Sequence, residues 1–290
     1  MRSLKAMFID ACNRQHGFMC DPRYDRKIAP GSTPTLFFGS QGIPERPVRV
    51  LTVGYNPSAG EFNRYACLAS SGRGLDIGSL DACKAYEAEV AIEKMRQYFE
   101  ERRRLNESGE HPWSGFFRSF EELLAPLSAS FFRGRRRFLA AHADVLTPFA
   151  SRSIRDLAYL PVLEYGRECF REVLEHFPDL HLVLGIGDRT RAAFQKIFGG
   201  IERLKSELPG VYAASTELSG HRIVVVCGDE WFRYGFAPFA GIDVRLVAQE
   251  IRRLLEEQRL LDFTEVGLLH PAELGPGGAM ADEGGGSGKG

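Results

Sequence analysis

The segment that decides the fold reads Val48-Arg49-Val50-Leu51-Thr52-Val53-Gly54-Tyr55-Asn56-Pro57-Ser58-Ala59-Gly60-Glu61-Phe62. Its first half is apolar and rich in β-branched residues, a pattern typical of a strand buried on both faces. Its second half contains Gly54, Asn56, Pro57 and Gly60, which favour turns. A buried strand followed by such a loop places polar groups at the carboxyl end of a sheet, where open α/β sheets bind ligands.

Three further apolar runs, at residues 143–147, 180–187 and 222–227, predict strands that alternate with helices. We therefore predict an α/β fold of three layers (α/β/α), with a central, mostly parallel four-stranded sheet plus N-terminal and helical extensions. Asp188 is expected to cap the helix that follows the third run. Helices are predicted at about residues 1–20, 79–104, 113–127, 162–176, 189–198 and 243–258, and short strands near residues 36–38 and 211.

Length and composition are those of an ordinary globular protein. The chain has 290 residues, 44% of them hydrophobic and 26% charged, with a net charge of -1. We expect one α/β domain over residues 1–265, with a helical elaboration at about 79–130, and a flexible Gly-rich tail over 266–290. The sequence contains no run of 18 apolar residues, so no membrane-spanning helix is predicted and a cytoplasmic protein is expected. The balanced charge means that any nucleic-acid surface must be a local patch.

The six cysteines are dispersed and contain no CxxC pair, so reduced thiols are expected. Cys67 and Cys83 have a spacing that an iron–sulfur cluster could use, but no close cysteine pair accompanies them. We expect neither a cofactor nor a metal.

The motif Gly54-Tyr55-Asn56-Pro57-Ser58 resembles the first motif of the uracil-DNA glycosylase superfamily, in which a strand ends in Gly-x-Asp/Asn-Pro-x. The later predicted strands follow in the family's order, so the resemblance covers roughly residues 48–260. It implies an enzyme that binds DNA, flips one nucleotide out of the duplex and hydrolyses its base–sugar bond. Positive charge develops on the sugar in that reaction, and nearby negative charge stabilises it. We expect a monomer.

The resemblance assigns roles to the motif loop. Asn56 stands where the family has its Asp or Asn, and an amide there can orient the attacking water although it cannot act as a base. Glu61 could supply the missing carboxylate, or it could be a solvated loop acid. Phe62 or Tyr65, the aromatic residues after the motif, could stack on the flipped base or could belong to the core. Gly54 and Tyr55 are also expected to bind the substrate.

Two residues favour a modified cytosine over uracil. Ser58 stands where uracil-restricted members of the family carry a Tyr that excludes 5-substituents, so room is left there. Asp144 stands where many members read uracil with an Asn. An ionised Asp only accepts hydrogen bonds, so it suits the exocyclic amine of cytosine and not uracil O4. The alternative for Asp144 is that it caps a turn.

Two segments are candidate DNA contacts. Arg135, Arg136 and Arg137 lie between aromatic residues and could bind phosphates, or could be a solvated loop. The loop after the last strand departs from the family, because it lacks the usual His-Pro-Ser. The residue that donates a hydrogen bond to the departing base is therefore not assigned by the resemblance. Arg233 could replace that donor, and Trp231 or Phe232 could wedge into the base stack.

Several functions remain open at this point. The first is a monofunctional glycosylase for modified cytosine, for example in defence against phage DNA, or for uracil and mismatches in repair. The second is a non-catalytic nucleic-acid-binding relative. The third is an unrelated α/β enzyme that binds phosphate at the turn 185–188.

Overall fold

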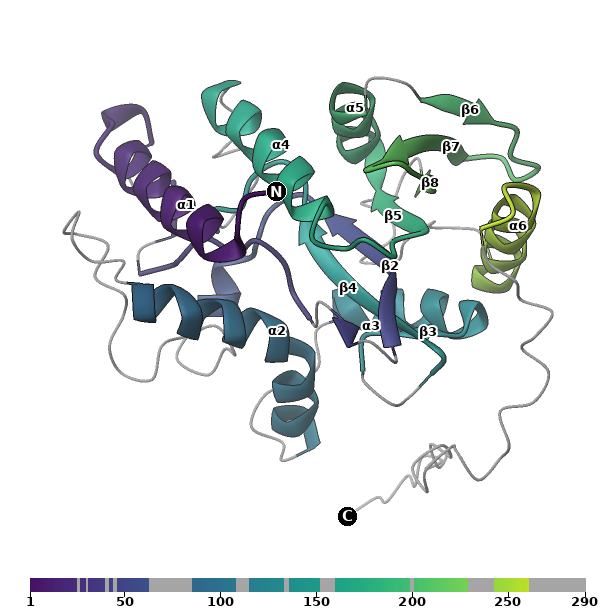
Figure 1. Ribbon diagram of the computed structural model, residues 1–290, viewed down its shortest axis with the longest axis horizontal. Helices are drawn as coiled ribbons and strands as arrows, with labels where there is room; N and C mark the ends of the chain where they lie inside the picture. Colours follow the sequence, from purple (N-terminus) through teal and green to yellow (C-terminus); the bar gives the residue numbers. More distant parts are fainter. Residues whose placement is uncertain are drawn as a thin grey trace, which may run out of the picture.

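The computed structural model describes residues 1–24, 27–29, 31–39, 42–43, 46–62, 85–107, 115–132, 136–151, 160–198, 201–228 and 243–260. The described helices are α1 (Leu4–Met19), α2 (Ala85–Glu107), α3 (Gly115–Leu124), α4 (Leu160–Leu174), α5 (Gly187–Ile197) and α6 (Val244–Glu257) (Figure 1). The strands are β1 (Gly42–Ile43), β2 (Arg46–Gly54), β3 (Ala129–Ser130), β4 (Phe138–Asp144), β5 (Leu182–Ile186), β6 (Glu202–Leu204), β7 (Val211–Leu218) and β8 (His221–Gly228).

One sheet organises the chain. Its strand order is β3-β4-β2-β5-β8-β7-β6, and β1 pairs with β2. The first five strands in this order, β3, β4, β2, β5 and β8, run parallel to one another. Strands β7, β6 and β1 are antiparallel to their neighbours. The α/β fold and the parallel centre of the sheet are therefore confirmed, with β4, β2, β5 and β8 corresponding to the four predicted strands. The sheet is wider than predicted because β3 extends one of its edges and β7 and β6 extend the other.

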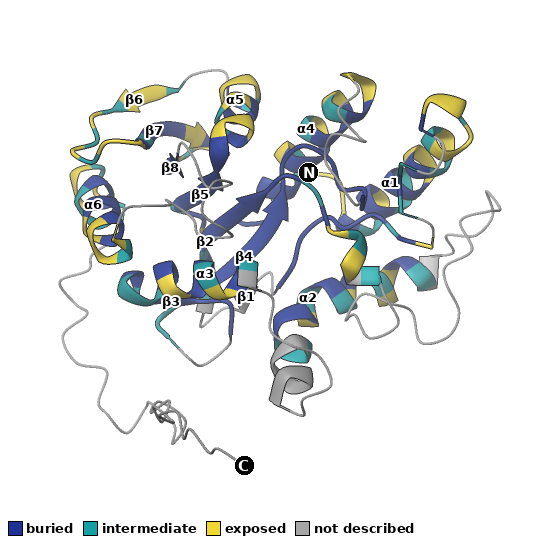
Figure 2. Cartoon of the chain, turned by 180° about the vertical axis from the view of Figure 1, so that it is seen from behind, coloured by how far each residue is buried: buried dark blue, intermediate teal, exposed yellow. Residues whose placement is uncertain are grey.

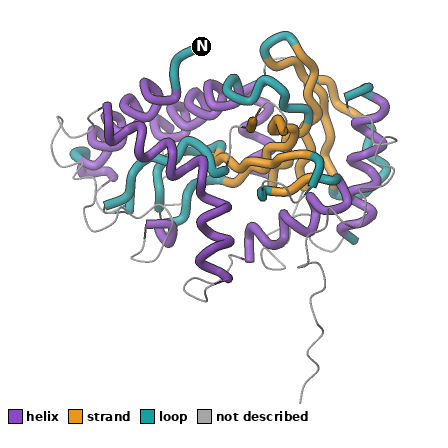
Figure 3. Tube along the Cα trace, turned by 60° about the horizontal axis from the view of Figure 1, so that its bottom comes forward, coloured by secondary structure: helices purple, strands orange, loops and turns teal. Residues whose placement is uncertain are grey.

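Helices cover both faces of this sheet. Helices α4 and α5 pack together on one face, and α3 and α6 pack together on the other (Figure 1). A view from another direction shows helices on both sides of the strands (Figure 3). The central strands are buried over most of their length, while each helix keeps an exposed outer side (Figure 2). This arrangement explains why the strand sequences are continuously apolar and the helices are not. It leaves the ends of the sheet as the places where polar groups can gather.

Three local predictions were wrong. Strand β4 ends, and does not begin, near Asp144, because its alanines fit the crowded centre of the sheet although they are weak strand formers. Residues 36–38 form no strand, only a single bridge between Phe38 and His142. Asp188 does not cap α5, because the chain turns from strand to helix at Gly187, whose φ is +75°. Asp188 lies in the first turn and pairs with Arg191 at 2.8 Å instead.

The amino end of the sheet contains a histidine whose ionisation affects stability. The guanidinium of Arg49 lies 3.3 Å from Nε2 of His181, which therefore acts as the acceptor, and Nδ1 is buried without a partner. Burial, together with the positive charge of Arg49 and the neighbouring His221, lowers the pKa of His181 to about 4. A proton on Nε2 would face the guanidinium directly, so the folded protein resists protonation there.

This contact predicts a loss of stability in weak acid. Between about pH 6.5 and pH 4 the unfolded chain protonates His181 and the folded chain does not, so the free energy of unfolding falls as the pH falls. After allowance for partial exposure of the ring, His181 should lower the free energy of unfolding by about 1 kcal/mol over this pH range. The variant His181→Gln keeps an acceptor for Arg49 and should show a flatter pH dependence in thermal denaturation. His16→Gln serves as the control, and an unchanged profile for His181→Gln would contradict the prediction.

Candidate active site

The motif loop and the segment after β4 are joined side by side at the carboxyl end of the sheet. Gly54, the last residue of β2, stands in register with Asp144, the last residue of β4. Backbone hydrogen bonds continue beyond the strands, where Leu146 donates to Tyr55 at 3.0 Å and Ala59 donates to Ser151 at 3.1 Å. The structure therefore brings together the two segments predicted to handle the water and to read the base.

Asn56 is held in one orientation by its amide nitrogen. Nδ2 donates to the backbone carbonyl of Pro57 at 2.8 Å and to Oγ of Ser151 at 3.1 Å. A carbonyl oxygen only accepts, so the amide group must face Pro57 with its nitrogen and not its oxygen. Within the described part of the chain no group donates to Oδ1 of Asn56. The side chain thus presents a fixed hydrogen-bond acceptor, the geometry needed to orient a water molecule.

Gly54 allows Asp144 to reach this edge. A Cβ at position 54 would lie 2.5 Å from Oδ1 of Asp144 and 3.1 Å from Nε2 of His142. Real Cβ atoms do not make contacts at 2.5 Å, so either side chain would have to move. The first glycine of the motif was expected to line the substrate pocket, and its role here is to give the carboxylate room beside the strand end.

Two buried polar side chains, those of His142 and Thr52, form a chain of contacts that ends at Asp144. The sequence analysis did not identify them. Nε2 of His142 lies 3.6 Å from Oδ1 of Asp144, and Nδ1 lies 2.8 Å from the hydroxyl of Thr52. His142 and Asp144 both have side chains less than 5% exposed. They are two residues apart in one strand, so they point to the same face, and this spacing could have identified the pair. The rings packed around the imidazole are Phe38, Phe116, Phe117 and Phe120.

The hydrogen on His142 is linked to the charge of Asp144. The single hydroxyl hydrogen of Thr52 can go to Nδ1 of His142 or to the carbonyl of Ala141, which is 3.2 Å away. In the first case Nε2 carries the ring hydrogen and faces an ionised carboxylate. In the second case Nδ1 carries it, and Nε2 can accept from a protonated carboxyl. The tautomer of His142 that faces Asp144 is therefore set by which acceptor the Thr52 hydroxyl takes.

The other predicted residues of the loop have varied positions. Ser58 is exposed, and its hydroxyl accepts from the backbone of Gly60 at 3.1 Å. Tyr55 is only 9% exposed. Phe62 packs against the hydrophobic core, which was the alternative predicted for it. Glu61 lies in the short 3₁₀ helix Ala59–Phe62, but its side chain is outside the described part of the chain. Tyr65 also lies outside it.

Arg136 and Arg137 do not lie at this site. They precede β4, whose two ends are about 20 Å apart. They therefore lie at the amino end of this strand, and Asp144 lies at its carboxyl end. Arg136 donates to the carbonyl of Ala129 at 3.2 Å and lies 3.7 Å from the buried carboxylate of Glu121. The guanidinium of Arg137 lies over the ring of Phe138, 5.2 Å from its centre. These contacts give both arginines structural roles at that end of the strand.

The remaining predicted residues, Arg135, Trp231, Phe232 and Arg233, lie outside the described residues, as do Cys67 and Cys83. Among the residues that are described, no three His, Cys, Asp or Glu side chains are grouped as metal ligands. None of the helices in this part of the chain is both long and apolar enough to cross a membrane.

The fold and these contacts define an α/β protein with a polar site where two parallel strands end. The site contains an oriented amide, a carboxylate backed by a buried histidine, and the glycine that separates them. No family model matches the chain, and no curated protein matches it in sequence. Any more specific function must therefore be argued from the residues of the site.

Proposed function

We propose that this protein is a monofunctional DNA glycosylase that removes a modified pyrimidine, with 5-substituted cytosine favoured. One observation carries the proposal: Gly54 and Asp144 are in register, so the loop of Asn56 and the end of β4 form one site. The motif Gly54-Tyr55-Asn56-Pro57-Ser58, which resembles that of the uracil-DNA glycosylase superfamily, begins at the last residue of a parallel strand, and this position supports the proposal.

In the proposed reaction, Asn56 and Asp144 each have a role. Water adds to C1′ of the deoxyribose as the bond between C1′ and the base nitrogen breaks, and the water gives up one proton while the departing base takes up one. Asn56 accepts a hydrogen bond from the water through Oδ1 and so directs its oxygen at the sugar. The carboxylate of Asp144 places negative charge near the sugar carbon, where positive charge develops.

Asp144 also supports the choice of base. As a carboxylate it accepts from the exocyclic amine of cytosine, and as a carboxyl it can donate to cytosine N3. Uracil O4 offers a second acceptor instead, which an ionised Asp144 repels. The exposed Ser58 leaves space for a group on the pyrimidine 5-position. Such bases occur in phage DNA, so a role in host defence is the biological setting we propose.

The variant Asp144→Asn tests this assignment, because an amide can donate to uracil O4. We expect the ratio of cytosine to uracil excision to fall by about 10- to 100-fold, which corresponds to about 1–3 kcal/mol of base discrimination. The measurement is strand cleavage by alkali after incubation with duplexes that contain uracil, a thymine mismatch, 5-hydroxymethylcytosine or glucosylated hydroxymethylcytosine. Asp188→Asn, at the same edge but paired with Arg191, is the matched control.

The outcomes separate the alternatives. Wild-type cleavage at uracil alone would keep the glycosylase but contradict the argument from Ser58 and Asp144. An unchanged preference in Asp144→Asn would show that this side chain does not read the base. Tight DNA binding without any cleavage would favour a non-catalytic DNA-binding protein.

A further inference from the structure

A cationic pocket lies between α4 and α5, next to the candidate active site. Its volume is about 300 Å³, and its floor includes Leu146, Leu163 and Ala193. Three cations, Arg167, Arg189 and Lys196, also line it, and none of its lining residues is acidic. The sequence analysis did not identify this cluster, because its cations come from two separate helices.

The three cations have no acidic partner within the part of the chain that the structure describes. No ion pair or hydrogen bond of Arg167, Arg189 or Lys196 is found among the described residues, whereas Arg191 on the same helix pairs with Asp188 at 2.8 Å. Unpaired positive charges that share one pocket repel each other, and an anion placed between them would relieve the repulsion. The pocket therefore fits a ligand with negative charge.

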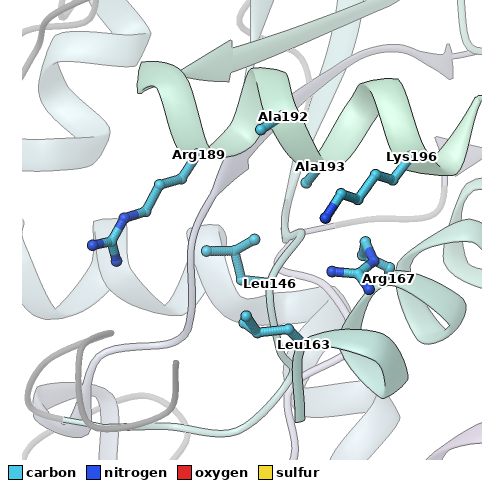
Figure 4. Close-up of a pocket in the computed structure, with 7 residues that line it drawn as sticks. All are labelled: Leu146, Leu163, Arg167, Arg189, Ala192, Ala193 and Lys196. Carbon is cyan, nitrogen blue, oxygen red and sulfur yellow. The ribbon is translucent and has the colours of Figure 1, made fainter. Parts of the chain in front are cut away.

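The arrangement of the side chains narrows the choice of ligand. The charged ends of Arg167 and Lys196 lie on one side of the two leucines, and that of Arg189 lies on the other (Figure 4). Along α5 the backbones of Arg189 and Lys196 are about 10 Å apart, at 1.5 Å per residue. Positive, apolar and positive regions thus follow each other, and a nucleic-acid strand has the complementary order of phosphate, sugar and phosphate.

The pocket is also linked to the candidate active site by a backbone hydrogen bond. Leu146 on its floor donates its backbone N–H to Tyr55, the neighbour of Asn56. Arg189 lies in the first turn of α5, directly after the carboxyl end of β5. A DNA strand whose nucleotide occupies the site could pass from the motif loop to this pocket.

We propose that the pocket of Arg167, Arg189 and Lys196 binds two successive phosphates of the DNA strand beside the flipped nucleotide. This inference rests on the proposed glycosylase function and adds a DNA-binding surface to it. Each phosphate contact releases counterions, so it contributes about 0.9 to the slope of log affinity against log salt for duplex DNA. Two contacts should therefore account for about 1.8 of that slope.

The test is binding of the full chain to a duplex with a stable abasic-site analogue, by fluorescence anisotropy at several NaCl concentrations. The pocket variant is Arg167→Ala, Arg189→Ala and Lys196→Ala combined. The matched control is Arg118→Ala, Arg171→Ala and Arg245→Ala combined, which removes the same charge from exposed helix positions outside the pocket. Circular dichroism establishes that both variants remain folded.

We expect the pocket variant to lose about 1.8 of the salt slope and at least tenfold in affinity, with the control near wild type. Equal losses in both variants, or no loss in the pocket variant, would overturn the proposal. Release of base is measured in parallel at saturating protein. If wild type releases base but the slope does not depend on the pocket, only the pocket proposal fails. If the slope falls as expected but wild type releases no base, only the glycosylase proposal fails.

Discussion

Replacing Gly166 with alanine is expected to destabilise the protein by about 1–3 kcal/mol, among the largest effects of any single methyl group here. A Cβ on Gly166 would lie 1.9 Å from the carbonyl oxygen of Leu146 and 2.8 Å from Cα of Thr147. These are backbone atoms, so no rotamer change can relieve the clash. Helix α4 would have to move away from the segment that follows β4, and the melting temperature should fall by several degrees.

Gly17→Ala is the matched control for this prediction. It makes the same chemical change within a helix, but nothing lies within 4 Å of the added methyl group. Alanine favours a helix over glycine by up to about 1 kcal/mol, so this variant should be as stable as wild type or slightly more stable. If thermal denaturation gave Gly166→Ala the same melting temperature as Gly17→Ala, α4 would not pack on the segment at 146–147 as described.

Replacing Asn56 with alanine is expected to reduce base excision by about 100-fold or more while DNA binding is retained. The change removes the acceptor Oδ1 and both contacts that fix its direction, so the water is no longer aimed at the sugar. The interaction acts on the reacting water and not on the bound duplex, so the loss should fall on the rate. Single-turnover excision and equilibrium binding, measured on one duplex, separate the two effects.

Asn13→Ala, at an exposed position of α1, controls for the loss of an amide away from the site. A proportional loss of binding and rate in Asn56→Ala would mean that Asn56 holds the DNA and does not direct water. An unchanged rate would remove Asn56 from the mechanism.

The centre of the fold was predictable because burial on both faces leaves a clear pattern in the sequence. The apolar runs of β2, β5 and β8 mark strands that no helix periodicity explains. The edges were less predictable, because strand β7 is rich in alanine and polar residues and depends on pairing with β8. The turn between them was readable in principle, since Ser219 and Gly220 both have positive φ, as a two-residue hairpin turn requires.

The site was predictable only where a local motif carried it. Asn56 and Asp144 were singled out by the family resemblance, and the parallel register brings the segments that carry them together. Thr52 and Ser151 were not, because their contacts join residues about 90 positions apart in the sequence. Arg136 was singled out from a basic cluster typical of phosphate binding, and it lies beside the buried carboxylate of Glu121 at the opposite end of the strands.

The most direct test of the central claim is mass spectrometry of the small molecules released from a duplex that carries glucosylated hydroxymethylcytosine. With protein in excess, a glycosylase releases one free modified base for each abasic site formed, and Asn56→Ala releases at least 100-fold less in the same time. Bound DNA from which the wild-type protein releases no free base, from this duplex or from those with uracil or 5-hydroxymethylcytosine, would contradict the proposed function.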